Sequence, residues 1–481
     1  NHDWANARYL VDACNSVGCT SSAELTTAGS ILKAIGFVKA SNTGAADQFS
    51  AQNGGGFSAT PSVGFSPAIA LSGDGQTLVV GSSREDSPDQ GISADQILPD
   101  DGTADASGAV YVFRHGASGW SQQAYIKASD AAPFGLFGMM VAVSQDGNTL
   151  AGSSAVGKVY VFRFSGSAWS EQAGLVVPGI ATTGGNTVDS LALDDSGNIL
   201  FVGQPFMPSG TGGSAIFSAG SVAVYRYDSG TSSWGTAQEV RSTAPLVDAH
   251  LGMSLSASGD GNVFVTGANG VPVLGKANAG VAYVFRYNSA TSSWAQERLL
   301  QASNPDADDD FGRAVAISRD GVTIAVSATN EGGAGSGVSN GGTGDLANGS
   351  SNAGAVYLYR FASGAWSQKA YIKAKASAVN GRFGQSLALS RDGTHLVAGQ
   401  FTTGADQYQY NTTTSLWDTA NIISITPVFG VVGRGVALSD DANTFAISSD
   451  RDRSNATGVT TADDPVTADT SATNSGAVYL Y

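Results

Sequence analysis

Cysteine, histidine, methionine and basic side chains are all scarce in this chain of 481 residues. There are 2 Cys, 4 His and 4 Met, and 24 Lys and Arg face 40 Asp and Glu, which gives a net charge of −16. An acidic surface repels phosphate backbones, so nucleic acid is not expected as a partner. The few histidines are scattered, with no His-Glu-x-x-His pair, and catalysis therefore has little support in the sequence. We expect a protein that is not an enzyme.

Long apolar runs are also missing, and no stretch approaches the roughly 20 residues that cross a bilayer, so no transmembrane segment is expected. The two cysteines, Cys14 and Cys19, lie close together with Gly18 between them. No other Cys and no nearby His can complete a zinc site with them. We expect a disulfide and hence an oxidising compartment, two free thiols being the alternative. A start at Asn1 without Met matches a processed, secreted protein, although a shortened sequence would look the same.

Glycine, in contrast, is abundant. The chain has 63 Gly, while only 13% of its residues are charged. This combination is typical of tightly turning β-structure with a nearly neutral surface and not of a helical enzyme.

A hairpin pattern recurs seven times. It is clearest where Phe311-Gly312 leads into an alternating apolar strand, an Asp320-Gly321 turn and a second strand that ends at Ala328. Asp-Gly between two apolar runs indicates a tight hairpin, for which we expect a type I′ turn with positive φ at both residues. The turns begin at Asp74, Asp146, Ser196, Asp260, Asp320, Asp392 and Asp441, and nine residues before them come Phe65, Phe137, Thr187, Leu251, Phe311, Phe383 and Val432.

Each repeat continues from the two strands of its hairpin, A and B, into two further strands, C and D. Strand C has a pattern such as Gly-Ala-Val-Tyr-Leu-Tyr-Arg at residues 354–360. Seven repeats of four antiparallel strands predict an all-β, seven-bladed β-propeller. Strand D starts with a tryptophan, which we interpret as packing between neighbouring sheets and not as a ring of binding aromatics. Six of the seven tryptophans take this position: Trp120, Trp169, Trp234, Trp294, Trp366 and Trp417.

The two ends of the chain predict how the ring closes. The last repeat stops after strand C at Tyr481, whereas residues 35–41 match the strand D of other repeats but follow no strands A to C. We therefore expect residues 35–41 to pair with residues 476–481, which would hide two sheet edges. An exchange of this strand between two copies is the alternative. The propeller would then span residues 32–481.

Residues 1–31 form an N-terminal extension outside the repeats. Asp3 can cap a short helix that carries Trp4, Leu10 and Val11 on one stripe. Such a stripe would pack either on the propeller as a lid or on a neighbouring subunit as a docking arm.

The repeat resembles the FG-GAP repeat of integrin-α-like propellers over about residues 33–481. The resemblance is carried by Phe311-Gly312, by Ser318-Arg-Asp320-Gly321 and by residues 354–359. It implies an extracellular or cell-surface module for adhesion or interaction, often with calcium in Asp-rich loops.

Calcium needs six to eight oxygen ligands, and one loop supplies the necessary density of carboxylates. This is the segment just before Phe311, with Asp306, Asp308, Asp309 and Asp310; Asp100, Asp101 and Asp105 form a weaker cluster. The segment lacks the Asp-x-Asp-x-Asp-Gly pattern of the family, and a solvated acidic loop is the alternative reading. Calcium at residues 306–310 is the only cofactor we predict.

The loops between strands B and C vary most in length, and propeller geometry places them on the same face as the loops between repeats. Loops on a rigid scaffold commonly carry recognition. The leading hypothesis is therefore a secreted, non-catalytic propeller for adhesion, or a structural subunit of an extracellular assembly or filament. Its partners would be further copies of itself, or cell-surface or matrix proteins or glycans. A carbohydrate-binding, lectin-like propeller is the alternative, and a glycan-active enzyme comes third. Sequons at Asn348, Asn411 and Asn455 fall in loops.

Overall fold

The structure is a computed structural model of the chain. In the propeller it describes residues 36–42, 44, 47, 49–50, 68–95, 104–180, 188–210, 214–341, 349–401, 403–425, 432–449, 452–460, 471–472 and 475–481. In the N-terminal extension it describes the strands at 8–9, 12–15, 18–21 and 25–26.

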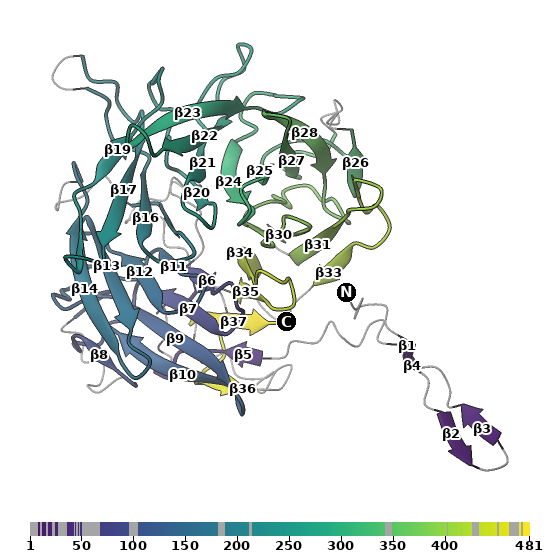
Figure 1. Cartoon of the computed structure of the whole chain (residues 1–481), viewed down its shortest axis with the longest axis horizontal. Helices are drawn as coiled ribbons and strands as arrows, with labels where there is room; N and C mark the ends of the chain where they lie inside the picture. Colours follow the sequence, from purple (N-terminus) through teal and green to yellow (C-terminus); the bar gives the residue numbers. More distant parts are fainter. Residues whose placement is uncertain are drawn as a thin grey trace.

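Seven antiparallel sheets surround a central axis, which confirms the predicted all-β, seven-bladed propeller (Figure 1). Within each blade, strand A is innermost and strand D outermost. No described residue lies in an α-helix. Blades 1 to 3 are formed by β6 (Ile69–Leu71), β7 (Thr77–Ser82), β9 (Ala109–Gly116) and β10 (Gly119–Ile126); by β11 (Val141–Val143), β12 (Thr149–Ser153), β13 (Lys158–Phe164) and β14 (Trp169–Val176); and by β15 (Ser190–Leu193), β16 (Ile199–Gln204), β17 (Ser221–Asp228), β18 (Ser233–Trp234) and β19 (Gln238–Val240).

Blades 4 to 7 repeat this order, and in blades 3 and 6 two short strands replace strand D. Their strands are β20 (Leu255–Ala257), β21 (Val263–Ala268), β22 (Val281–Asn288) and β23 (Ser293–Leu300); β24 (Phe311–Ile317), β25 (Thr323–Ala328), β27 (Ala355–Ala362) and β28 (Ala365–Ile372); β29 (Leu387–Leu389), β30 (His395–Gln400), β31 (Gly404–Asn411), β32 (Leu416–Trp417) and β33 (Ile423–Ile425); and β34 (Val432–Leu438), β35 (Phe445–Ser449), β37 (Ala477–Leu480) and β5 (Gly36–Val38).

The turn between strands A and B differs from the predicted type I′ turn. In the first blade the loop lies between Ser72 and Thr77, and Gly75 N–H donates to Ser72 O at 2.9 Å. Gly75 has a φ of 69°, whereas Asp74 is not among the residues with positive φ. The Asp74 carboxylate instead accepts from the Ser72 hydroxyl and from Gln76 N–H, as Asp side chains do in turns. The prediction was wrong because the loop is longer than two residues, so only the glycine needs the left-handed conformation.

A ring of backbone hydrogen bonds joins these turns around the axis. In each turn the residue before the Asp-Gly pair, or the Asp itself, donates its N–H to the carbonyl of the equivalent residue in the next blade. Seven such bonds, 2.8 to 3.2 Å long, return to their starting point. They connect Gly73, Gln145, Asp195, Gly259, Arg319, Arg391 and Asp440.

The seventh sheet contains strands from both ends of the chain. β5 pairs antiparallel with β37, with Val38 opposite Val478 and Phe37 opposite Tyr479. The chain then enters the first blade at Phe49, whose N–H donates to Ser475 O at 3.0 Å.

Phe49, and not Phe65, holds the place that Phe137, Phe311 and Phe383 hold in other blades. Its ring lies 5.3 Å from that of Tyr111, as the Phe311 ring does from Tyr357. The prediction of Phe65 was therefore wrong for this contact, because the chain between Phe49 and Ile69 is longer than in the other repeats. Phe65 itself lies outside the described residues.

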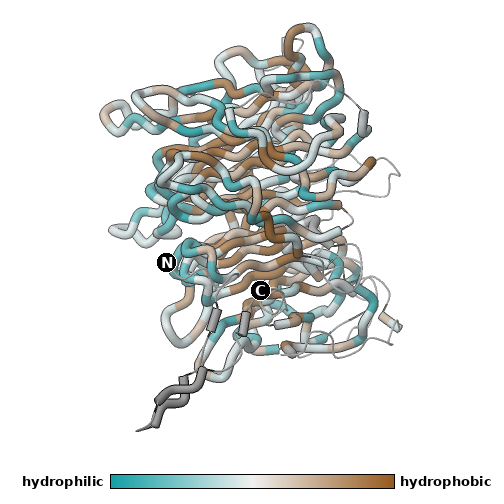
Figure 2. The backbone as a smooth tube through the Cα atoms, turned by 90° about the vertical axis from the view of Figure 1, so that its right-hand side faces the viewer, coloured by the Kyte–Doolittle hydropathy of each residue, from teal (hydrophilic) through white to brown (hydrophobic). Residues whose placement is uncertain are grey.

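The hydrophobic core lies between neighbouring blades. In Figure 2 the hydrophobic residues lie mainly in the interior of the molecule and the hydrophilic residues mainly in the loops at its periphery. The tryptophans of strand D pack at these interfaces; for example, the Trp294 ring lies 4.8 Å from Phe264 of its own blade and 5.7 Å from Phe201 of blade 3. Trp417 is 1% exposed.

Three blades carry a fifth strand that the sequence did not predict. In blades 1, 5 and 7 the long loop between strands B and C returns to the outer edge and pairs antiparallel with strand D. These covering strands are β8 (Ile92–Ser93), β26 (Val338–Asn340) and β36 (Val459–Thr460).

The N-terminal extension contains strands where a helix was predicted. β2 (Asp12–Asn15) and β3 (Gly18–Ser21) form a two-stranded hairpin, and β1 (Arg8–Tyr9) pairs with β4 (Leu25–Thr26). The helix prediction was wrong because Asn15-Ser-Val-Gly18 is a turn signal, and the residues on its two sides pair as a hairpin. Trp4, Leu10 and Val11 lie outside the described residues.

Candidate functional site: the loop face

The loops between strands B and C and the loops between blades lie together on one face of the ring, as predicted. In several blades the loop that leaves strand D is hydrogen-bonded to the preceding loop between strands B and C. Asp248 N–H donates to Phe217 O at 3.0 Å, and Phe134 N–H donates to Asp105 O at 2.7 Å. We call this side of the molecule the loop face.

Buried lysines connect strand D to the long loops in the three blades with a covering strand. Lys127 lies 2.5 Å from Glu85, Lys373 lies 2.6 Å from Glu331, and Lys39 lies 2.8 Å from Asp452. All three lysines are at most 1% exposed. The backbone N–H groups of these lysines donate to the carbonyls of Gly91, Gly337 and Gly458, which lie just before the covering strands, at 2.8 to 2.9 Å. We call each of these ion pairs a lysine clamp.

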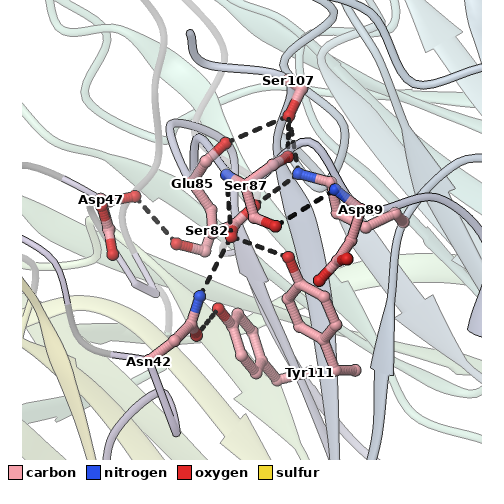
Figure 3. Close-up of polar contacts among 10 residues, drawn as sticks. Asn42, Asp47, Ser82, Glu85, Ser87, Asp89, Ser107 and Tyr111 are labelled. Carbon is pink, nitrogen blue, oxygen red and sulfur yellow. Dashed lines mark hydrogen bonds and ion pairs between the residues drawn. The ribbon is translucent and has the colours of Figure 1, made fainter. Parts of the chain in front are cut away.

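The clamp of blade 1 belongs to a larger network of buried polar groups (Figure 3). Lys127 Nζ donates to one oxygen of Glu85, and the other oxygen accepts from Tyr125 O–H at 2.7 Å and from Asn42 Nδ2 at 3.0 Å. The Asn42 amide oxygen in turn accepts from Tyr111 O–H. Because Asn42 follows the last strand of blade 7, the network joins blades 7 and 1 across the closure of the ring.

Blade 5 repeats this network atom for atom. Glu331 accepts from Lys373 Nζ through one oxygen, and from Tyr371 O–H at 3.0 Å and Asn304 Nδ2 at 3.2 Å through the other. Tyr357 O–H donates to Asn304 Oδ1 at 2.7 Å. Asn304 follows the last strand of blade 4, so this network joins blades 4 and 5.

Buried charges of this kind hold the loops in one arrangement. A carboxylate removed from water needs a donor at each oxygen, and each network supplies these donors from two blades and a loop. Burial, and next the charge of Glu85, raise the pKa of Tyr125 well above its usual range, so this phenol stays a donor. The loop face is thus a rigid platform at the junctions of blades 7 and 1 and of blades 4 and 5.

The predicted calcium ligands, Asp306, Asp308, Asp309 and Asp310, lie beside this second network. Asp309 is buried, and its Oδ2 accepts from Asp306 N–H at 2.7 Å. Burial raises its pKa to about 6, against the opposing effect of that hydrogen bond. The other three carboxylates face different donors, Lys276, Asn278 and Asn269, at 2.8 to 3.0 Å. No group of three or more potential ligands converges among the described residues, and calcium binding stays a prediction. Of the weaker cluster, Asp100 and Asp101 lie outside the described residues.

Large apolar side chains are exposed on the same face. Phe217 is 68% exposed, Val247 60% and Leu274 83%. Hydrogen bonds connect their three loops, since Asp248 N–H donates to Phe217 O and Gly270 N–H donates to Ala249 O. We call these three residues the apolar ridge. Sequence analysis missed it, because isolated apolar residues in Gly-rich loops give no periodic signal.

The central channel has a different character. Strand A of every blade contributes to a cavity of about 210 Å³ lined mainly by Ala, Val, Leu and Ile. At the end with the hairpin turns, Arg391 lies 3.1 Å from Asp195 and 3.0 Å from Asp440. Arg319 lies 3.5 and 3.7 Å from the same two carboxylates. Asp195 and Asp440 are therefore both engaged in ion pairs.

The remaining predicted residues are placed only in part. The register of the hairpin puts Cys14 opposite Cys19. Opposite residues of an antiparallel pair lie within the range of Cα separations that a disulfide spans. The disulfide stays a prediction. Asn411 and Asn455 are exposed, whereas Asn348 lies outside the described residues.

The fold is a seven-bladed β-propeller in which one antiparallel sheet is repeated seven times. Residues 294–359, from strand D of blade 4 to strand C of blade 5, match the FG-GAP repeat family. The match has the length of one repeat, and together with the seven blades it supports the FG-GAP resemblance that the sequence pattern indicates.

None of the curated proteins gives a significant match. Among solved structures, a protein of Bacteroides uniformis ATCC 8492 described as a 6-phosphogluconolactonase is 14% identical, with a TM-score of 0.45 over 71% of this chain and 84% of that one. Nothing about the activity of this chain follows from that likeness. In the described part of the chain, no helix has the length and hydrophobicity to span a bilayer.

Proposed function

We propose that this protein is a non-catalytic propeller that acts outside the cell, in adhesion or as a structural subunit of an extracellular assembly. The observation that carries the proposal is the apolar ridge, because large apolar side chains grouped on a soluble surface mark interaction sites. The ridge stands on loops that are hydrogen-bonded to each other and to the rigid blades. Its partners would be further copies of the chain, or cell-surface or matrix proteins or glycans.

Charge supports the same proposal. Exposed carboxylates of Asp248 and Asp308 border the ridge, and the chain as a whole is strongly acidic. A contact with an apolar centre and a charged rim is the common anatomy of a protein interface. FG-GAP repeats are typical of extracellular proteins, which favours a location outside the cell.

Two observations support a non-catalytic role. The two carboxylates at the end of the channel, Asp195 and Asp440, are engaged in ion pairs with Arg391. The spacing Gly337-x-Ser339-x-Gly341 is that of a nucleophile elbow, but Ser339 lies in β26 opposite Tyr371. A nucleophile elbow requires a sharp turn from a strand into a helix.

The test replaces the apolar ridge. We expect the triple variant Phe217→Ser, Val247→Ser and Leu274→Ser to reduce binding of the labelled protein to the surface of the producing cells about tenfold or more. Leu416→Ser is the matched control, because this side chain is 49% exposed but lies at the start of β32, directly after the turn between strands C and D of blade 6 and on the opposite face. Binding would be measured by flow cytometry, with circular dichroism to verify the fold. Equal binding by the triple variant would refute the role of the ridge, and competition by free glycans would favour the lectin-like alternative.

A further inference from the structure

The outer edges of the seven blades are protected in different ways, and one of them is open. A strand D with an unpaired outer edge exposes backbone donors and acceptors to any other strand. In blades 1, 5 and 7 the covering strands β8, β26 and β36 occupy this edge. In blades 3 and 6 the outer strand is broken into two short pieces, which leaves no long edge.

The two remaining blades, 2 and 4, have continuous outer strands of eight residues, β14 and β23, and no covering strand among the described residues. β23 carries charge on its outer half: Arg298 is exposed, and Glu297 forms an ion pair with Arg286 at 2.8 Å. Charged side chains are a common protection of edge strands. β23 is therefore shielded by its sequence.

β14 has less protection of this kind, because its one charged residue, Glu171, is half-buried and accepts from the Ser129 hydroxyl at 2.9 Å. Every second residue is exposed, and these four residues are Ser170, Gln172, Gly174 and Val176, none of which is charged. Val176 is 64% exposed. It holds the position that Lys127 and Lys373 hold in blades 1 and 5, seven residues after the tryptophan of strand D. The lysines are buried beside the covering strands, whereas no described strand lies beside Val176 at the outer edge of β14.

The N-terminal hairpin has the complementary property. β2 and β3 form a sheet of only two strands, with no further strand paired to either among the described residues. Such a hairpin is marginally stable by itself. Figure 1 shows it apart from the blades. Its second strand begins Gly18-Cys-Thr, which has the same order of glycine, apolar residue and hydroxyl residue as the three covering segments. These segments begin at Gly91 (Gly-Ile-Ser), Gly337 (Gly-Val-Ser) and Gly458 (Gly-Val-Thr).

We propose that β14 of blade 2 receives the β2–β3 hairpin of a second copy of this chain, with β3 as the added strand. This inference rests on the proposed function and names the contact by which copies would assemble. Main-chain hydrogen bonds would supply most of the attraction, as in other cases of strand addition. The covering strands run antiparallel to strand D and place their apolar residue opposite Ile126, Ile372 and Val38. The same register puts Cys19 opposite Leu175 and Thr20 opposite Gly174.

The contact joins two different surfaces, so every copy can offer one hairpin and receive one. Contacts of this kind are heterologous and build open chains unless their rotation closes a ring. The protein would therefore form linear or ring-shaped assemblies.

The experiment compares the full chain with an edge variant, Gln172→Lys with Val176→Lys, which places two charges on the exposed stripe of β14. The matched control is Ala295→Lys with Leu299→Lys, at two exposed positions of the same spacing in β23. A third variant lacks residues 12–21. Mass would be measured by light scattering and sedimentation velocity over a range of concentrations, and particles viewed by electron microscopy.

We expect the full chain and the control to assemble in multiples of the monomer mass, and the edge variant and the hairpin deletion to remain monomers. A mixture of the edge variant and the hairpin deletion should form dimers and nothing larger. The edge variant supplies only a hairpin, and the hairpin deletion supplies only an open edge. If both variants assemble as the full chain does, the contact lies elsewhere and the proposed function stands. If the full chain stays monomeric yet binds cells through the apolar ridge, this inference fails and adhesion stands. Loss of both assembly and ridge-dependent binding would overturn the proposed function as well.

Discussion

The lysine clamp of blade 5 gives the sharpest test of how the loop face is held. In the variant Lys373→Met, Glu331 would lose the donor at 2.6 Å while remaining 1% exposed, so solvent could not replace the lost charge. Breaking a buried ion pair on one side costs about 3–5 kcal/mol. Because Glu331 keeps Tyr371 O–H and Asn304 Nδ2, we expect a loss near the lower end of this range.

Two further variants separate the buried charge from the loss of contacts. Lys373→Met combined with Glu331→Gln should recover much of the stability, since no unpaired charge remains. Lys158→Met breaks the pair with Asp130, which is as short at 2.5 Å but has side chains that are 32% and 49% exposed, and should cost at most about 1 kcal/mol. Denaturant unfolding followed by tryptophan fluorescence measures all three. Equal losses for Lys373→Met and Lys158→Met would refute the argument, as would a double variant no more stable than Lys373→Met.

Three other outcomes follow from the same structure. Gly476→Ala should cost about 1–3 kcal/mol more than Gly458→Ala in denaturant unfolding, because both glycines have positive φ but only at Gly476 would a Cβ meet the Phe49 carbonyl, at 1.9 Å. An equal cost would show that Phe49 can move away. Asp309 has a pKa of about 6, above its usual 3.8, so its carboxyl lowers stability as the pH rises from about 4 through 6; Asp309→Asn should gain stability over the wild type at neutral pH and not below about pH 4. A gain of equal size at both pH values would contradict this assignment. We further propose that calcium binds at residues 306–310: calcium should then raise the melting temperature and Asp308→Asn should reduce the rise, whereas an unchanged melting temperature of the wild type would exclude the site.

The number of blades could be predicted from the sequence because the signals are local and repeated in one register. An Asp-Gly turn, a strand such as residues 354–360 and a tryptophan follow each other at similar spacings in most repeats, so a weak signal in one copy is supported by the others. The pairing of residues 36–38 with the last strand could be anticipated because that segment resembles a strand D and lacks strands A to C.

The errors arose where one position depends on another part of the chain. Phe65 satisfied the spacing to its turn, but spacing carries no information about an insertion between Phe49 and Ile69. The Asp-Gly pairs looked like two-residue turns, whereas the residue before the Asp is needed for the ring of backbone hydrogen bonds around the axis. Such a ring has no sequence signature, because any residue supplies a carbonyl and nearly any residue an N–H.

The covering strands have a short sequence pattern that does not by itself indicate a strand. A segment of glycine, an aliphatic residue and Ser or Thr occurs in the long loops of blades 1, 5 and 7, and each of these blades has a lysine seven residues into strand D or at the matching place, Lys39. Two or three residues pair in each covering strand, too few to give an apolar alternation. The buried lysine was the more informative residue, since an uncompensated lysine is almost never buried.

The residue seven positions after the tryptophan of strand D thus differs between blades with a covered outer edge and blades without one. A lysine there would be too costly to bury without a carboxylate, and the carboxylate is supplied by the loop that also provides the covering strand. Loop, lysine and covered edge therefore occur together, and a blade without the loop needs another residue at this place. Exposed Gln301 and Val176, and Arg241 and Ser424 in the broken strands, fill it in the other blades. Since Gln301 lies in the blade whose outer strand carries Arg298, Val176 is the one residue of this set that combines an unbroken strand, uncovered among the described residues, with an uncharged exposed stripe. The propeller thus has one blade, blade 2, whose outer edge can receive a strand of another molecule. The position that distinguishes this blade, Val176, is the same position that holds the buried lysine in the blades with a covering strand.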